Sequence, residues 1–135
     1  MTRLGVLFIL ITSVLQAQNI SIIGKQFIAN VNSVCEETPD DNPCAGEEIY
    51  VVVKFLKDMV ELAEKGISSC DKETYIRKFK YNYEIKENDI LITLKPEEVE
   101  YTHLKEIKFT IENKKLFGAI TYPNGKIIVY EFKEE

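Results

Sequence analysis

Several residue types that build common functional sites are scarce in this chain of 135 residues. Tryptophan is absent, histidine occurs once, as His103, and the three cysteines form no C-x-x-C pair. A closed zinc site needs several converging histidine or cysteine ligands, which this composition cannot supply. Ser68 and Ser69 lack the G-x-S-x-G context of a hydrolase nucleophile. We therefore expect no metal ion, no cofactor and no catalytic activity.

Basic residues are also fewer than acidic ones. The chain has 17 basic and 22 acidic side chains, which give a formal net charge of −5. Binding to nucleic acid depends on the neutralisation of phosphates by lysine and arginine, so we expect no nucleic-acid partner. An anionic membrane surface is disfavoured for the same reason. Internal repeats, low-complexity tracts and interdomain linkers are missing, and the length predicts one domain.

Long apolar runs are confined to the start of the chain. Arg3 precedes the apolar residues 4–14, and Leu15-Gln16-Ala17 fits a cleavage site, a pattern typical of a signal peptide. The run is shorter than the roughly 20 residues that a transmembrane helix needs. We expect residues 1–17 to be a cleaved signal peptide and residues 18–135 to be a single secreted or periplasmic domain with no stable membrane anchor.

Three cysteines follow the expected signal peptide, at Cys35, Cys44 and Cys70. In an oxidising compartment one disulfide is expected, and one thiol is then left over. Cys35 and Cys44 flank a short acidic loop, so a Cys35–Cys44 bridge is the simplest pairing. Cys70 lies in another turn region and could replace either partner.

Alternation of apolar and polar residues dominates the rest of the chain. In residues 75–94, Phe79, Tyr81 and Tyr83 share one face, and the residues between them are polar or charged. This period of two predicts a β-hairpin, with its turn at Glu87-Asn88-Asp89. Similar patterns predict further strands at residues 24–33, 50–55, 106–112, 116–122 and 126–132.

The segment 55–66 fits two templates. Phe55, Met59 and Leu62 lie at helical spacing, and ELAEK has high helix propensity. Alternatively, Lys57-Asp58 is a tight turn that begins a second strand. The regular spacing of strands elsewhere favours this hairpin, because tertiary context overrides propensity.

Eight short strands joined mostly by tight turns predict an all-β antiparallel up-and-down meander, with one short helical turn after Pro96. Asn124-Gly125 is the strongest turn signal. A meander must cover its apolar face and remove its edges, and closure into a small barrel does both. An eight-stranded barrel has an interior just wide enough for its own side chains or one small ligand.

The pattern resembles the lipocalin-like, or calycin, small barrels of exported bacterial proteins. The residues that carry this resemblance are Gly24-Lys25-Gln26-Phe27, Phe55…Asp58…Val60, Tyr81…Tyr83…Ile85…Asn88…Ile90, Leu116…Gly118 and Val129…Phe132. The opening is similar to the G-x-W of lipocalins, with Phe27 where the tryptophan would stand. The resemblance implies a meander barrel that binds a ligand, and it implies no catalytic residue.

The aromatic side chains supply the candidate ligand-binding residues. Aromatic rings with polar tips suit an apolar ligand held by a few hydrogen bonds, and the predicted set is Phe79, Tyr81, Tyr83 and Phe109. The competing interpretation is a barrel core filled by these same rings.

We expect a binding protein for a small apolar ligand. The alternative is a protein-binding module, such as a proteinase inhibitor, that uses the Cys35–Cys44 loop. A second outward feature, the lysine row Lys78, Lys80 and Lys86, is predicted to be a solvated face that protects against edge pairing.

Overall fold

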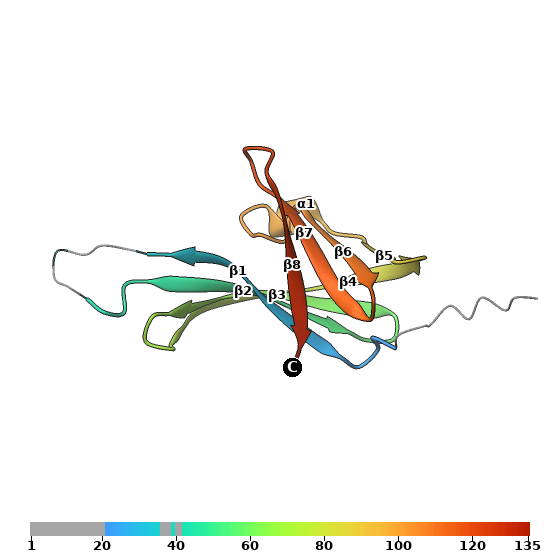
Figure 1. The fold of residues 1–135 in the computed structure, drawn as a ribbon, viewed down its shortest axis with the longest axis horizontal. Helices are drawn as coiled ribbons and strands as arrows, with labels where there is room; N and C mark the ends of the chain where they lie inside the picture. Colours follow the sequence, from blue (N-terminus) through green and yellow to red (C-terminus); the bar gives the residue numbers. More distant parts are fainter. Residues whose placement is uncertain (1–20, 36–38, 40–41) are drawn as a thin grey trace, which may run out of the picture.

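The computed structural model describes residues 21–35, 39 and 42–135 (Figure 1). The expected signal peptide, residues 1–17, and most of the acidic loop between Cys35 and Cys44 lie outside the described residues. The elements are β1 (Gln26–Val34), β2 (Glu47–Phe55), β3 (Met59–Ser68), β4 (Glu73–Lys86), β5 (Asp89–Ile92), α1 (Pro96–Val99), β6 (Ile107–Glu112), β7 (Lys115–Thr121) and β8 (Ile127–Glu134).

The eight strands form a closed barrel in which each strand pairs antiparallel with its neighbours in the chain, and β8 returns to β1. This confirms the predicted all-β up-and-down barrel with one short helix. The segment 55–66 is a hairpin, because Phe55 pairs with Val60 and the Leu56 N–H donates to the Met59 carbonyl oxygen at 2.8 Å. The helical alternative for this segment is wrong.

Turn chemistry fixes the register of the later hairpins. Asn113 and Lys114 both have positive φ, 49° and 65°, as a two-residue turn between twisted strands requires. Gly125 has φ +80°, and its N–H donates to the Tyr122 carbonyl oxygen at 2.9 Å. The predicted Asn124-Gly125 turn is therefore confirmed.

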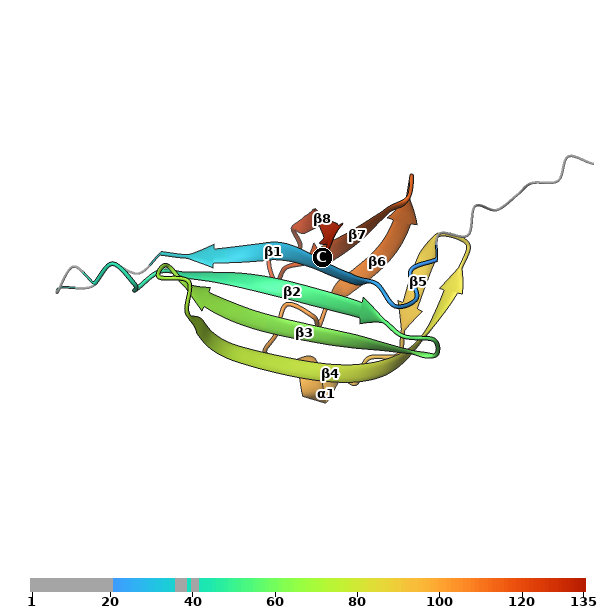
Figure 2. The same ribbon diagram turned by 90° about the horizontal axis from the view of Figure 1, so that it is seen from below.

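The barrel is uneven in height. Strands β1 to β4 run as long, curved neighbours that extend past the shorter strands β5 to β8 (Figure 2). The closing pair is short, because only Phe27 and Ile28 of β1 pair with β8, through Glu134 and Lys133. Further along this seam the ladder between β1 and β8 is missing among the described residues.

The connection between β5 and β6 closes one part of the barrel core. It contains α1, and its residues Val99 and Leu104 are fully buried. They join a core that includes Phe27, Val51, Val53, Phe55, Val60, Leu62, Ile90, Phe109, Leu116 and Phe132. Within the described part of the chain, no helix has the length and apolar character needed to cross a bilayer.

Candidate functional site

The four predicted ligand-binding aromatics pack in the barrel interior. Tyr81 and Phe109 are buried, while Phe79 and Tyr83 are half-buried against the same core. The Phe79 and Tyr81 rings are stacked with centroids 6.3 Å apart, and the Tyr83 hydroxyl donates to the Leu56 carbonyl oxygen at 2.8 Å. The set is therefore brought together as part of the core, and its role in ligand binding stays a prediction.

A buried carboxylate lies on the inner face of β3. Strand alternation places Glu64 inward with Val60 and Leu62, and its side chain is only 3% exposed. Of the residues that the structure describes, it is the one buried charged residue. Burying a charge is costly unless hydrogen bonds compensate for the lost water, so its partners show what this position does.

Three donors satisfy Glu64. The backbone N–H of His103 donates to Oε2 at 2.6 Å, and Nδ1 of the same histidine lies 2.9 Å from that oxygen. The Tyr75 hydroxyl donates to Oε1 at 3.0 Å. Glu64 thus fixes both the backbone and the ring of His103, a residue 39 positions away in the chain.

The pKa values reflect this arrangement. Burial alone would raise the pKa of the Glu64 carboxyl, but the side-chain and backbone hydrogen bonds from His103 outweigh it and leave the pKa below its ordinary value. Burial, together with the nearby Glu64 charge, raises the pKa of the Tyr75 hydroxyl. At neutral pH the network therefore contains an ionised carboxylate and a neutral phenol.

The contact with Glu64 also determines the tautomer of His103. A carboxylate can only accept, so Nδ1 carries a proton and donates to it. In the neutral ring, Nε2 is then an acceptor, and it lies 3.4 Å from Nδ2 of Asn32 on β1. The ring also meets Tyr122 edge to face, with centroids 6.3 Å apart. The imidazole is therefore oriented from three sides.

Two tyrosines bridge the seam where the β1–β8 ladder is missing. The hydroxyls of Tyr122 and Tyr130 lie 2.7 Å apart, and each is within hydrogen-bonding distance of the Val31 carbonyl oxygen, at 3.1 and 2.9 Å. Burial and the Tyr122 hydroxyl raise the pKa of Tyr130. These side chains take the place of ladder hydrogen bonds and hold Tyr122 beside His103.

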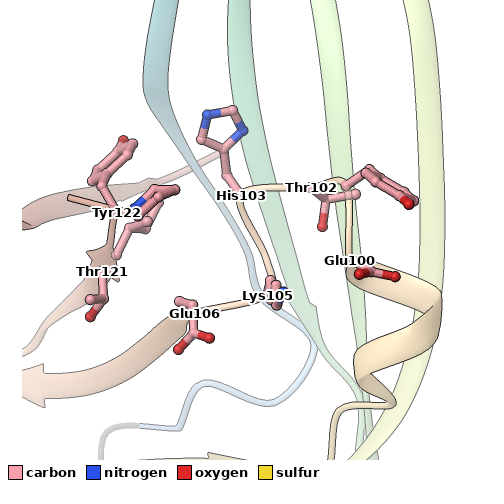
Figure 3. A pocket seen from close by; sticks show the side chains of 10 residues that line it. Glu100, Thr102, His103, Lys105, Glu106, Thr121 and Tyr122 are labelled. Carbon is pink, nitrogen blue, oxygen red and sulfur yellow. The ribbon is translucent and has the colours of Figure 1, made fainter. Parts of the chain in front are cut away.

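A pocket of about 590 Å³ opens between the α1–β6 connection and the β7–β8 turn (Figure 3). We call it the His103 pocket, and it is lined by Glu100, Tyr101, Thr102, His103, Lys105, Glu106, Ile120, Thr121, Tyr122 and Pro123. Figure 3 shows His103 between Tyr122 on one side and Thr102 on the other. The Tyr101 side chain is 85% exposed and is the most accessible apolar surface of this set.

Among the described residues, the His103 ring contacts Glu64, Asn32 and Tyr122, and no hydroxyl or thiol nucleophile is hydrogen-bonded to it. A carboxylate–imidazole pair is the orienting half of a catalytic triad. The Thr102 hydroxyl, however, donates to the Val99 carbonyl oxygen at 2.8 Å and accepts from the Leu104 N–H at 3.2 Å. Cys70 is held in a disulfide and offers no thiol. The described contacts suit hydrogen bonding to a ligand better than nucleophilic attack.

Sequence reasoning missed Glu64 and gave His103 no binding role. The signal for Glu64 was present, since it continues the inward series Val60 and Leu62 once the segment is recognised as a strand. His103 gives no such signal, because only the folded connection brings it to β3.

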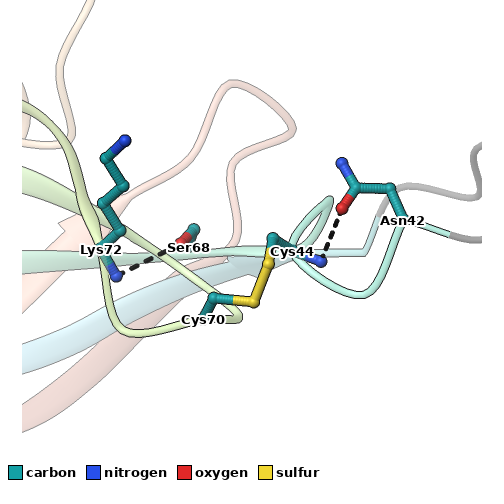
Figure 4. Close-up of a disulfide and its surroundings, with 5 residues drawn as sticks. All are labelled: Asn42, Cys44, Ser68, Cys70 and Lys72. Atoms are coloured by element: carbon teal, nitrogen blue, oxygen red, sulfur yellow. Dashed lines mark hydrogen bonds between the residues drawn. A yellow bond between two sulfur atoms is a disulfide. The ribbon is translucent and has the colours of Figure 1, made fainter.

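The predicted Cys35–Cys44 disulfide is wrong. The structure joins Cys44 to Cys70, with Cα atoms 5.1 Å apart (Figure 4). Cys35 is left as a free, exposed cysteine. The reason is strand register. Glu47 pairs with Ser68, so the chain just before β2 meets the chain just after β3. The pairing of strands, and not the separation in sequence, therefore decides which cysteines are joined.

Comparison of the chain with protein-family models, with curated proteins and with solved structures yields no match. The eight-stranded antiparallel barrel is compatible with the lipocalin-like resemblance. A disulfide is also the kind of cross-link found in extracellular and periplasmic proteins.

Proposed function

We propose that the chain is a secreted or periplasmic, lipocalin-like binding protein without catalytic activity, which holds a small, largely apolar ligand in the His103 pocket. The observation that carries the proposal is the pocket itself. Its volume of about 590 Å³ lies within the roughly 300–1,000 Å³ typical of small-molecule sites. Its lining combines apolar surface with a few fixed polar groups.

The lining favours a ligand with an apolar body and one or two polar groups. Tyr101, Ile120, Tyr122 and Pro123 offer apolar surface, and His103 offers a hydrogen-bonding ring whose orientation is set from behind. A pre-oriented polar group loses little entropy when it binds. The partly open position of the pocket lets a ligand enter without opening the barrel.

The proposed site lies outside the barrel interior, which in an eight-stranded barrel could hold one small ligand. Leu104 and Val99 enter the core from the β5–β6 connection and are fully buried there. The ligand of this protein therefore binds beside the connection and not beneath it. The competing proposal, a proteinase inhibitor that uses the Cys35–Cys44 loop, lacks the disulfide that would close this loop.

The test uses the neutral fluorescent probe N-phenyl-1-naphthylamine on the mature protein. We expect saturable binding that weakens about tenfold in Tyr101→Ala, since the loss of one aromatic contact costs on the order of 1.5 kcal/mol. Tyr101 is highly exposed, so this change leaves the fold intact. Ile127→Ala on β8, also an exposed apolar residue, is the matched control and should bind like wild type.

Mass spectrometry of an extract from protein purified from its native host should also reveal a bound small molecule. No saturable binding and an empty extract would refute the proposal. Inhibition of proteinases by the same preparation would then favour the protein-binding alternative.

A further inference from the structure

A second concave surface lies on the outer face of β2, β3 and β4, away from the core. These three strands lie side by side in Figure 2. The hollow has a volume of about 600 Å³. We call it the lysine groove and define it by Val52, Lys54, Ala63, Lys65, Ile76 and Lys78.

Strand register explains how these side chains come together. Lys54 stands opposite Glu61, which stands opposite Lys80, so one row crosses the three strands. The next outward row contains Val52, Ala63 and Lys78. Period-two alternation sends all of them to the face away from the core.

The groove concentrates positive charge on an acidic chain. Its lining also includes Lys80, Glu61 and Glu73, so four lysines and two carboxylates meet there, whereas the whole chain has a net charge of −5. Lys80 pairs with Glu61 at 2.9 Å. No described carboxylate forms an ion pair with Lys54, Lys65 or Lys78.

The lysines of the groove lower the pKa of Glu61. The hydrogen bond from Lys80 is the main cause that lowers the pKa of this carboxyl, and the charges of Lys54 and Lys78 lower it further. One carboxylate therefore faces three ammonium groups, and two of these are left for another anion.

Between the lysines the floor is apolar. Val52 and Ala63 are directly opposite each other, and Ile76 lies on the neighbouring strand with 42% of its side chain exposed. Lysine side chains keep their charged ends in water while their stems cover apolar surface. A plain solvated lysine face would not require this partly exposed apolar strip.

We propose that the lysine groove is a binding site for a small amphipathic anion, such as a medium-chain carboxylate, whose head contacts Lys54 and Lys78 while its chain lies over Val52, Ala63 and Ile76. Lysine supplies a compact charge with three donors, which suits a carboxylate head. The site is separate from the His103 pocket, and it extends the interpretation of Lys78 and Lys80 as a merely protective row.

The test is a titration of the ¹⁵N-labelled mature protein with octanoate, 1-octanol and acetate, followed by NMR. We expect saturable amide shifts from octanoate at residues 52–54, 61–65 and 76–80, and much weaker responses to the other two. The Lys54→Gln/Lys78→Gln variant should bind octanoate at least about tenfold more weakly, because each lost charged hydrogen bond changes affinity by roughly that factor.

Lys108→Gln/Lys133→Gln is the matched control, since it removes the same charge from other exposed positions and should bind octanoate like wild type. Equal responses to octanoate and 1-octanol, or unchanged binding in Lys54→Gln/Lys78→Gln, would overturn the proposal. So would octanoate shifts confined to the residues of the His103 pocket.

Discussion

Replacement of Glu64 by alanine should destabilise the barrel far more than replacement of an outward glutamate on the same strand. The change leaves three donors without their acceptor, namely the Tyr75 hydroxyl and two N–H groups of His103. Removal of one partner from a buried charged network costs about 3–5 kcal/mol. Because Tyr75 and His103 are only partly buried, water can reach some of these donors, and we expect about 3 kcal/mol.

Glu64→Gln separates the effect of charge from the effect of shape. An amide oxygen in the place of Oε2 can still accept from both N–H groups of His103, and the amide NH₂ then takes the place of Oε1 and can donate to the Tyr75 hydroxyl. We expect the free energy of unfolding to fall by about 1 kcal/mol, the usual net value of one hydrogen bond. The order of stability should therefore be wild type, then Glu64→Gln, then Glu64→Ala.

The assay is urea denaturation at pH 7 with the disulfide intact, followed by circular dichroism. Glu61→Ala is the control, because Glu61 is on the same strand but faces outward and pairs with Lys80 in solvent. Exposed pairs of this kind contribute little. If Glu64→Ala unfolds at the same urea concentration as Glu61→Ala, the Glu64 network does not hold the connection in place.

Three further measurements test the charge of Glu64, the disulfide and the packing at Gly118. The depressed pKa of Glu64 means that its stabilising contribution is complete above the ordinary value of 4.5 and disappears as pH falls through the lower folded-state pKa; thermal melts below pH 4.5 should therefore show a smaller acid loss in Glu64→Gln than in wild type. Cys44→Ser/Cys70→Ser removes a cross-link between residues 26 apart and should lower the free energy of unfolding by about 3 kcal/mol. An unchanged midpoint of urea denaturation would contradict this. Gly118→Ala places a Cβ 2.6 Å from the Phe132 ring and should cost about 1–3 kcal/mol by overpacking, whereas Ala119→Ser on the same strand should not.

Most of the architecture could be predicted because period-two alternation and turn residues act locally. The hairpin at residues 75–94 was recognisable from the alternation of Phe79, Tyr81 and Tyr83 with polar residues and from the turn at Glu87-Asn88-Asp89, and Gly125 marked the last turn. The segment 55–66 was harder, since ELAEK favours a helix in isolation. The inward faces of Val60 and Leu62 complete the core only in a strand, so burial overrides propensity.

The site could not be predicted because it depends on contacts between segments that are distant in sequence. Glu64 and His103 meet only because the β5–β6 connection folds back onto β3. The disulfide was misjudged for the same reason, since Cys44 and Cys70 become neighbours only when Glu47 pairs with Ser68. The periodicity and spacing of residues in the sequence do not predict contacts of this kind.

The β5–β6 connection ties the core and the proposed site together. Leu104 fills the barrel interior, while the adjacent His103 faces the pocket and is held by Glu64 from inside the barrel. Because Leu104 and His103 are adjacent, a movement of Leu104 out of the core would also disturb the hydrogen bonds that position His103. Packing of Leu104 and order in the His103 pocket therefore depend on the same short segment. This is why loss of Glu64 should weaken binding in the pocket as well as stability.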